Sequence, residues 1–213
     1  MPAVSSFSEV GGHPHNEDAF GVRAHPADEK ALLVALADGM GGQAGGGPAA
    51  RLAVRVALET ACQSPLSELV WESLLSAADR AVERDNEAGY TTLVALSVVG
   101  NQVVGASQGD SAVWFRDGAG RSWELTNHQN RGAPVGSGDA RFVPFAVTLT
   151  PPWTVLVMSD GVWKYVGWGP IKLAAERLRG EELIQELASR ARGKQSGQFP
   201  DDFTVVAIHD PEG

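Results

Sequence analysis

The residues of this sequence best suited to chemistry are aspartates that stand beside apolar segments. They occur at Asp18, Asp38, Asp160 and the pair Asp201–Asp202. Carboxylates gathered where packed strands end would repel one another strongly unless a proton or a cation neutralises them. Oxygen ligands select hard cations such as Mg²⁺, Mn²⁺ or Ca²⁺. The pattern therefore indicates a divalent-cation site, and Gly39 after Asp38 would let the backbone carbonyl approach the metal.

Each Asp-Gly pair also has a plainer interpretation. Such pairs are common turn signals, and Asp117-Gly118, which lies between two apolar segments, is predicted to be the turn of a hairpin. A structural domain whose aspartates merely end strands is therefore one alternative.

Two apolar runs lead into the aspartates. Ala31–Ala37 stops at Asp38 and Trp153–Met158 stops shortly before Asp160, and each run is typical of a buried strand. Further strands are expected at Phe20–Val22, Thr91–Val99, Gln102–Gln108, Ala112–Arg116, Arg121–Leu125 and Thr204–His209, and a loop at Asn127–Asp139. Helices are expected at Pro48–Ala61, Ser64–Val82, Ile171–Leu178 and Glu181–Ala191, with the first two packed antiparallel. This order predicts an α+β layered fold, and since no repeat or linker is evident, one domain over residues 1–213.

The bulk composition excludes several classes of function. With 43% hydrophobic and 20% charged residues, the sequence is that of a folded globular protein. Its net charge of -9 argues against a nucleic-acid partner. The single cysteine, Cys62, cannot form an internal disulfide and is expected in a helix core. No signal peptide and no apolar run long enough to cross a bilayer can be recognised, so we expect a cytoplasmic protein without a membrane partner.

Six motifs, taken in order, resemble the PP2C family of phosphatases, also called the PPM family. They are Asn16–Ala19, Ala37–Gly42, Gly89–Leu93, Gly109–Ser111, Ser159–Trp163 and Asp201–Val206. The resemblance covers almost the whole chain and preserves the order and approximate spacing of the motifs. Met40 makes the sequence similar to the bacterial branch of the family.

The resemblance implies a four-layer α-β-β-α sandwich, in which helix pairs flank two central, mainly antiparallel sheets. It also implies a two-metal centre at one end of the sandwich. Asp38 would bridge the metals and Gly39 would offer its carbonyl oxygen to one of them. Asp160 and Asp201 would bind the other, while Asp18 and Glu17 would act directly or through metal-bound waters.

The chemistry that the resemblance implies is hydrolysis of phosphoserine or phosphothreonine. Two Mn²⁺ or Mg²⁺ ions per chain, roughly 3.5–4 Å apart, would lower the pKa of a bridging water and clamp the phosphoryl oxygens. The resulting hydroxide would attack phosphorus in line while the serine or threonine oxygen leaves. A phosphorylated protein is the implied substrate, and a cognate Ser/Thr protein kinase is the natural further partner.

Two residues depart from the family's pattern. His13 stands five residues before Asp18, where the family usually has an arginine that grips the substrate phosphate. A protonated histidine can donate to phosphate but lacks the two-pronged geometry of arginine, and His13 could equally be a loop residue without a ligand. Lys164 stands four residues after Asp160, where many members have an aspartate for a third metal. Its ammonium would repel a cation near Asp110, unless its flexible stem turns outward into solvent.

The connection between the Gly109 and Ser159 motifs is also shorter than is usual, which implies a shortened flap, the region that helps to choose substrates. These departures keep open a second function from another class. A pseudophosphatase or phosphoprotein-binding regulatory scaffold with little turnover would keep the same acidic residues.

Overall fold

The computed structural model describes residues 1–40, 45–129, 132–193 and 196–210. Its strands are β1 (Ala3–Glu9), β2 (Asp18–His25), β3 (Asp28–Asp38), β4 (Leu93–Val99), β5 (Gln102–Gln108), β6 (Ala112–Arg116), β7 (Ser122–Glu124), β8 (Val143–Thr148), β9 (Thr154–Met158) and β10 (Phe203–His209). Its helices are α1 (Gly46–Gln63), the short 3-10 helix η1 (Leu66–Glu68), α2 (Trp71–Glu83), α3 (Asp160–Val166), α4 (Trp168–Arg177) and α5 (Gly180–Ala191). Among the described residues, no helix is both long and apolar enough to cross a membrane.

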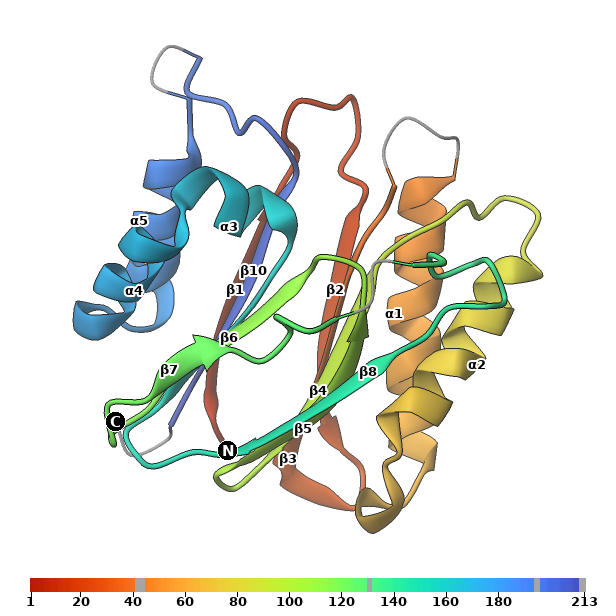
Figure 1. Cartoon of the computed structure of the whole chain (residues 1–213), viewed down its shortest axis with the longest axis horizontal. Coiled ribbons are helices and arrows are strands. Elements are labelled where there is room, and N and C mark those ends of the chain that lie inside the picture. Colours follow the sequence, from red (N-terminus) through yellow and green to blue (C-terminus); the bar gives the residue numbers. More distant parts are fainter. Residues whose placement is uncertain (41–44, 130–131, 194–195, 211–213) are drawn as a thin grey trace.

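The strands form two five-stranded sheets, in the orders β1-β10-β9-β6-β7 and β2-β3-β4-β5-β8. Neighbouring strands pair antiparallel in both sheets. Helices α1 and α2 run antiparallel over the outer face of the second sheet, and α3, α4 and α5 cover the first (Figure 1). The expected α-β-β-α sandwich is confirmed, with α3 added to the expected helix pair on one side.

Strand β3 shows why this sequence makes four layers. Successive side chains of a strand point to opposite faces. Leu33 and Ala35 pack toward α1 and α2, whereas Val34 and Leu36 pack into the apolar layer between the two sheets. Because all four side chains are fully buried, the continuous apolar run holds β3 rigidly between two cores, up to the Asp38 that ends it.

Most of the expected elements are confirmed, but the helix predicted from Ser64 is wrong in its first part. Pro65 is extended, with φ -59° and ψ 139°, and only the 3-10 helix η1 forms before α2 begins at Trp71. Strands β1 and β8 and helix α3 were not expected from the sequence. Strands β1 and β8 lie at sheet edges, where polar residues and a proline such as Pro144 are tolerated and the apolar pattern is weak. Gly41 and Gly42 of the glycine-rich motif, and residues 130–131 of the expected loop, lie outside the described residues.

Candidate active site

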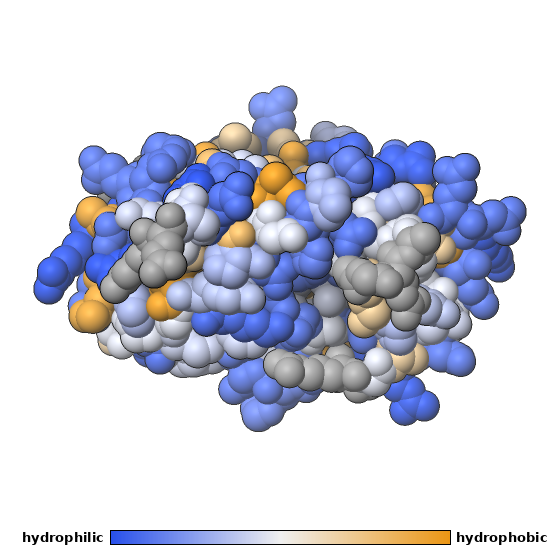
Figure 2. Space-filling view, turned by 90° about the horizontal axis from the view of Figure 1, so that it is seen from above, coloured by the Kyte–Doolittle hydropathy of each residue, from blue (hydrophilic) through white to orange (hydrophobic). Residues whose placement is uncertain are grey.

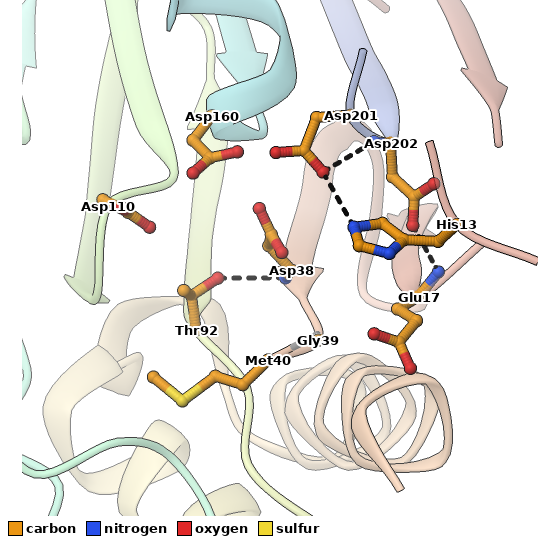
Figure 3. A pocket seen from close by; sticks show the side chains of 10 residues that line it. All are labelled: His13, Glu17, Asp38, Gly39, Met40, Thr92, Asp110, Asp160, Asp201 and Asp202. Atoms are coloured by element: carbon orange, nitrogen blue, oxygen red, sulfur yellow. Dashed lines mark hydrogen bonds and ion pairs between the residues drawn. The ribbon is translucent and has the colours of Figure 1, made fainter. Parts of the chain in front are cut away.

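All the aspartates singled out in the sequence except Asp18 come together in a cavity of about 460 Å³ at one end of the sandwich (Figure 3). Its lining consists of His13, Glu17, Asp38, Gly39, Met40, Thr92, Asp110, Asp160, Asp201 and Asp202. Strand ends and connections of both sheets supply these residues. Seen from above, this end of the molecule is covered mainly by hydrophilic residues (Figure 2). The cavity therefore contains most of the site residues expected from the sequence, with oxygen as the dominant donor atom.

Asp38 is held in place through its backbone. Its N–H donates to Thr92 Oγ1 at 2.9 Å, and its carbonyl oxygen accepts from Thr92 N–H at 2.9 Å and from Thr91 Oγ1 at 2.8 Å. The hydroxyl of Thr92 also meets that of Ser111 at 2.8 Å. The hydrogen bonds from Thr91 and Thr92 use only the peptide groups of Asp38. Its carboxylate points into the cavity (Figure 3).

Two glycines confine the backbone of Asp201 and Asp202. A Cβ atom on Gly11 would lie 2.0 Å from the carbonyl carbon and oxygen of Asp201, and one on Gly161 would lie 2.0 Å from the carbonyl oxygen of Asp202. No side chain fits at either glycine without moving backbone. The glycine of the Asp160-Gly161 pair is thus required by close packing at the start of α3, and it brings Asp160 and Asp201 to the same cavity.

Asp202 organises the loop that carries His13 and Glu17. Its Oδ1 accepts the N–H of Gly11 at 2.7 Å and its Oδ2 accepts the N–H of Glu17 at 2.7 Å. Asp201 was the ligand expected from the sequence, and Asp202 had no expected role. The doubled aspartate was the available signal, because neighbouring residues point in different directions and can serve a site and its support separately.

His13 lies at the edge of the cavity, with its Nε2 atom 3.5 Å from Oδ1 of Asp201 (Figure 3). Its side chain is 45% exposed and that of Asp201 is 34% exposed. The structure therefore brings His13 to the cavity and pairs it with an aspartate.

Lys164 turns inward. Its ammonium donates a hydrogen bond to Asp160 Oδ2, one helical turn earlier in α3, and lies 3.8 Å from Asp110 Oδ2. Burial lowers the pKa of Lys164, but its hydrogen bond to Asp160 and the charges of nearby carboxylates outweigh this and leave the pKa raised. The alternative of a side chain turned away into solvent is not what the structure has.

Asp18 is buried outside the cavity lining. It stands opposite Asp38 in the register of β2 and β3, and its side chain is almost fully buried. Among the described residues, none makes a hydrogen bond of good geometry to either carboxyl oxygen of Asp18. Burial raises the pKa of Asp18 to about 7, although the hydroxyls of Thr204 and Ser159 lie near enough to act in the opposite sense.

The electrostatics of the cavity favour the binding of a cation. Burial, followed by the charges of Asp18 and Asp160, raises the pKa of Asp38 to about 9. Such carboxyl groups, together with the buried Asp18, are an oxygen donor set that fits hard divalent cations. In the part of the chain that the structure describes, no three acidic, histidine or cysteine side chains already enclose a single ion.

A family model described as stage II sporulation protein E (SpoIIE) matches residues 28–210. No curated protein matches the chain.

Several solved structures have the same fold. The catalytic domain of the serine/threonine protein phosphatase PstP, in complex with 2 manganese ions, matches with TM-score 0.80 and 21% identity, over 98% of this chain and 97% of that one. The serine/threonine phosphatase Stp1 from Staphylococcus aureus matches with TM-score 0.78 and 20% identity, over 99% of this chain and 95% of that one. RsbX in complex with magnesium matches with TM-score 0.73 and 16% identity, over 99% of this chain and 100% of that one. The chain therefore shares the sandwich of PP2C-type phosphatases.

Proposed function

Since the chain belongs to the SpoIIE family, we propose that it is a metal-dependent phosphatase that hydrolyses phosphoserine and phosphothreonine in proteins. The single observation that carries the proposal is the acidic cavity at the end of a PP2C-type sandwich. Residues 1–213 would act as one catalytic domain with a shortened flap. A cytoplasmic signalling role, opposite a Ser/Thr protein kinase, belongs to the same proposal.

The cavity residues are assigned different roles in binding the metal ions. Asp38 and the Gly39 carbonyl, with Asp160 and Asp201, would hold two Mn²⁺ or Mg²⁺ ions, and Glu17 and Asp18 would act on the same ions directly or through water. The ions in the PstP and RsbX structures support this choice of metals. When bound, such cations supply an activated water and positive charge that offsets the charge of the phosphoryl oxygens.

Hydrogen bonds within the chain fix the backbone that carries the proposed metal ligands. Thr91 and Thr92 fix the backbone of Asp38, and Asp202 fixes the backbone of the loop before β2. A site whose supporting groups are already bonded loses less free energy in ordering when substrate binds. Because no side chain is needed as a nucleophile, the absence of a convincing serine or cysteine constellation in the sequence fits direct attack by water.

A regulatory scaffold is the second candidate, favoured by the pairing of Lys164 with Asp160, a proposed metal ligand. One experiment separates the two. The purified chain is mixed with a fluorescent phosphoserine peptide and Mn²⁺, and both fluorescence anisotropy and released inorganic phosphate are followed. A phosphatase gives many turnovers of phosphate per chain, with the dephosphorylated peptide as product. Tight binding with no phosphate released would instead support the scaffold.

His13 is proposed to contact the substrate phosphate in place of the family's arginine. Replacing it with alanine should raise the Michaelis constant for a phosphopeptide roughly threefold to tenfold, with a smaller effect on kcat, since one hydrogen bond to a charged group is lost. His13→Arg should lower the Michaelis constant, because a guanidinium grips phosphate with two parallel bonds. His15→Ala, in the same exposed loop, is the control. An unchanged Michaelis constant in His13→Ala would make His13 a bystander.

A further inference from the structure

The ammonium of Lys164 has three neighbouring groups beside the acidic cavity. It hydrogen bonds to Asp160, lies 3.8 Å from Asp110 Oδ2, and sits 5.6 Å from the centre of the Trp163 ring. The indole is itself fixed, because Trp163 Nε1 donates to the carbonyl oxygen of Asp110 at 3.0 Å and the ring stacks on that of Trp168. Two carboxylates and an aromatic face all favour positive charge at this point.

The local geometry of α3 produces this placement. Residues four apart in a helix lie on the same face, which puts the Lys164 side chain beside the Asp160 carboxylate at the helix N-terminus. Asp110 lies outside α3, in the connection between β5 and β6, and its carboxylate approaches the same ammonium. Asp110 and Asp160 both line the cavity, so the lysine already neutralises part of the negative charge that would attract cations there.

We propose that Lys164 acts as a built-in cation between Asp110 and Asp160, so that this cavity binds one divalent cation fewer than it would with a neutral residue at position 164. A divalent ion near both carboxylates would have to displace an ammonium that is covalently tethered and therefore always present at high local concentration. The inference rests on the proposed function only in that cations bind in this cavity. It concerns their number, not the turnover.

The test is to count bound metal with and without the lysine. Metal-free chain is titrated with Mn²⁺ while the electron paramagnetic resonance signal of free Mn²⁺ is followed, which gives stoichiometry and affinity without any substrate. Lys164→Gln removes the charge and retains most of the length of the side chain. We expect it to bind one more Mn²⁺ per chain than the unmodified protein, or to bind its weakest Mn²⁺ at least tenfold more tightly. Lys164→Arg keeps the charge and should bind the same number as the unmodified protein.

Lys172→Gln is the matched control, since Lys172 is an exposed lysine on α4 and its loss changes the net charge equally. Its Mn²⁺ isotherm should match that of the unmodified chain. The inference is overturned if Lys164→Gln and the unmodified chain give the same isotherm, or if Lys172→Gln gains as much as Lys164→Gln. Circular dichroism checks that each variant is folded. Lys164→Arg remains informative if Lys164→Gln does not fold. A chain that gains the extra Mn²⁺ yet releases no phosphate would refute the proposed function and leave this inference standing.

Discussion

An Asp38→Asn variant is expected to fold but to lose phosphatase activity by on the order of a thousandfold or more, which is about 4 kcal/mol of transition-state stabilisation. Asp38 ends β3 with its backbone fixed by Thr91 and Thr92 and its carboxylate in the cavity. An amide keeps the shape of the side chain and these backbone contacts. It removes the negative charge that would balance the cations, so metal affinity and turnover should fall together.

The same substitution should not destabilise the metal-free protein. Burial and the neighbouring carboxylates already disfavour the charged form of Asp38, as its raised pKa of about 9 indicates. A neutral amide avoids the free-energy cost of protonating this carboxyl on folding, so the free energy of unfolding in EDTA should be equal or higher. Asp139→Asn, at an exposed loop position, is the matched control for the change in charge. Near-normal turnover in Asp38→Asn, with normal Mn²⁺ affinity, would refute the assignment of the metal ligands.

The metal-free protein is expected to become less stable as the pH rises from about 7 to 9. In this range the unfolded chain has lost the Asp38 proton, whereas the folded chain retains it because the pKa is raised to about 9. The folded state then binds more protons than the unfolded state, so the free energy of unfolding falls with rising pH, by up to roughly 1.4 kcal/mol per pH unit for one such group. Asp18, with a pKa of about 7, contributes in the same direction at the lower end of the range.

A second titrating group limits where this effect can be seen. Burial lowers the pKa of His209 to about 4, so its contribution rises with pH but is complete near pH 6.5. Urea unfolding in EDTA is therefore best measured above that pH. Saturating Mg²⁺ should remove much of the decline, because a cation bound to the Asp38 carboxylate would displace its proton, so that the folded and unfolded chains would no longer differ in protons there. Stability that is flat or rising between pH 7 and 9 in EDTA, and no different in Asp38→Asn, would contradict the crowding of carboxylates at this site.

The sequence predicted the structure well where burial on both faces of an element restricted the residues to apolar ones. The apolar run that ends at Asp38 is buried on both faces, so its length and end could be predicted. Edge strands β1 and β8 carry no such constraint, because one side of each faces solvent or lacks a neighbour, and neither was predicted. Helix α3 was missed because Asp160-Gly161 has the form of a turn, while the glycine is in fact needed for contact with Asp202.

The candidate site could be predicted as a set of residues but not as a set of contacts. Asp38, Asp160 and Asp201 lie in one cavity, as expected from strand ends that converge. The supporting role of Asp202 and the inward turn of Lys164 depend on distances between segments far apart in the chain. Such contacts leave no periodic pattern in a sequence, so only the three-dimensional structure could assign them.

The proposed function requires divalent cations in the acidic cavity. The rate of phosphate release from a phosphoserine peptide, followed as Mn²⁺ is added to chain stripped of metal, tests this requirement. We expect no measurable release without metal, a rise to a plateau with added Mn²⁺, and a return to none with excess EDTA. Release that proceeds equally well in EDTA, or the lack of any release at saturating Mn²⁺, would contradict the proposed function.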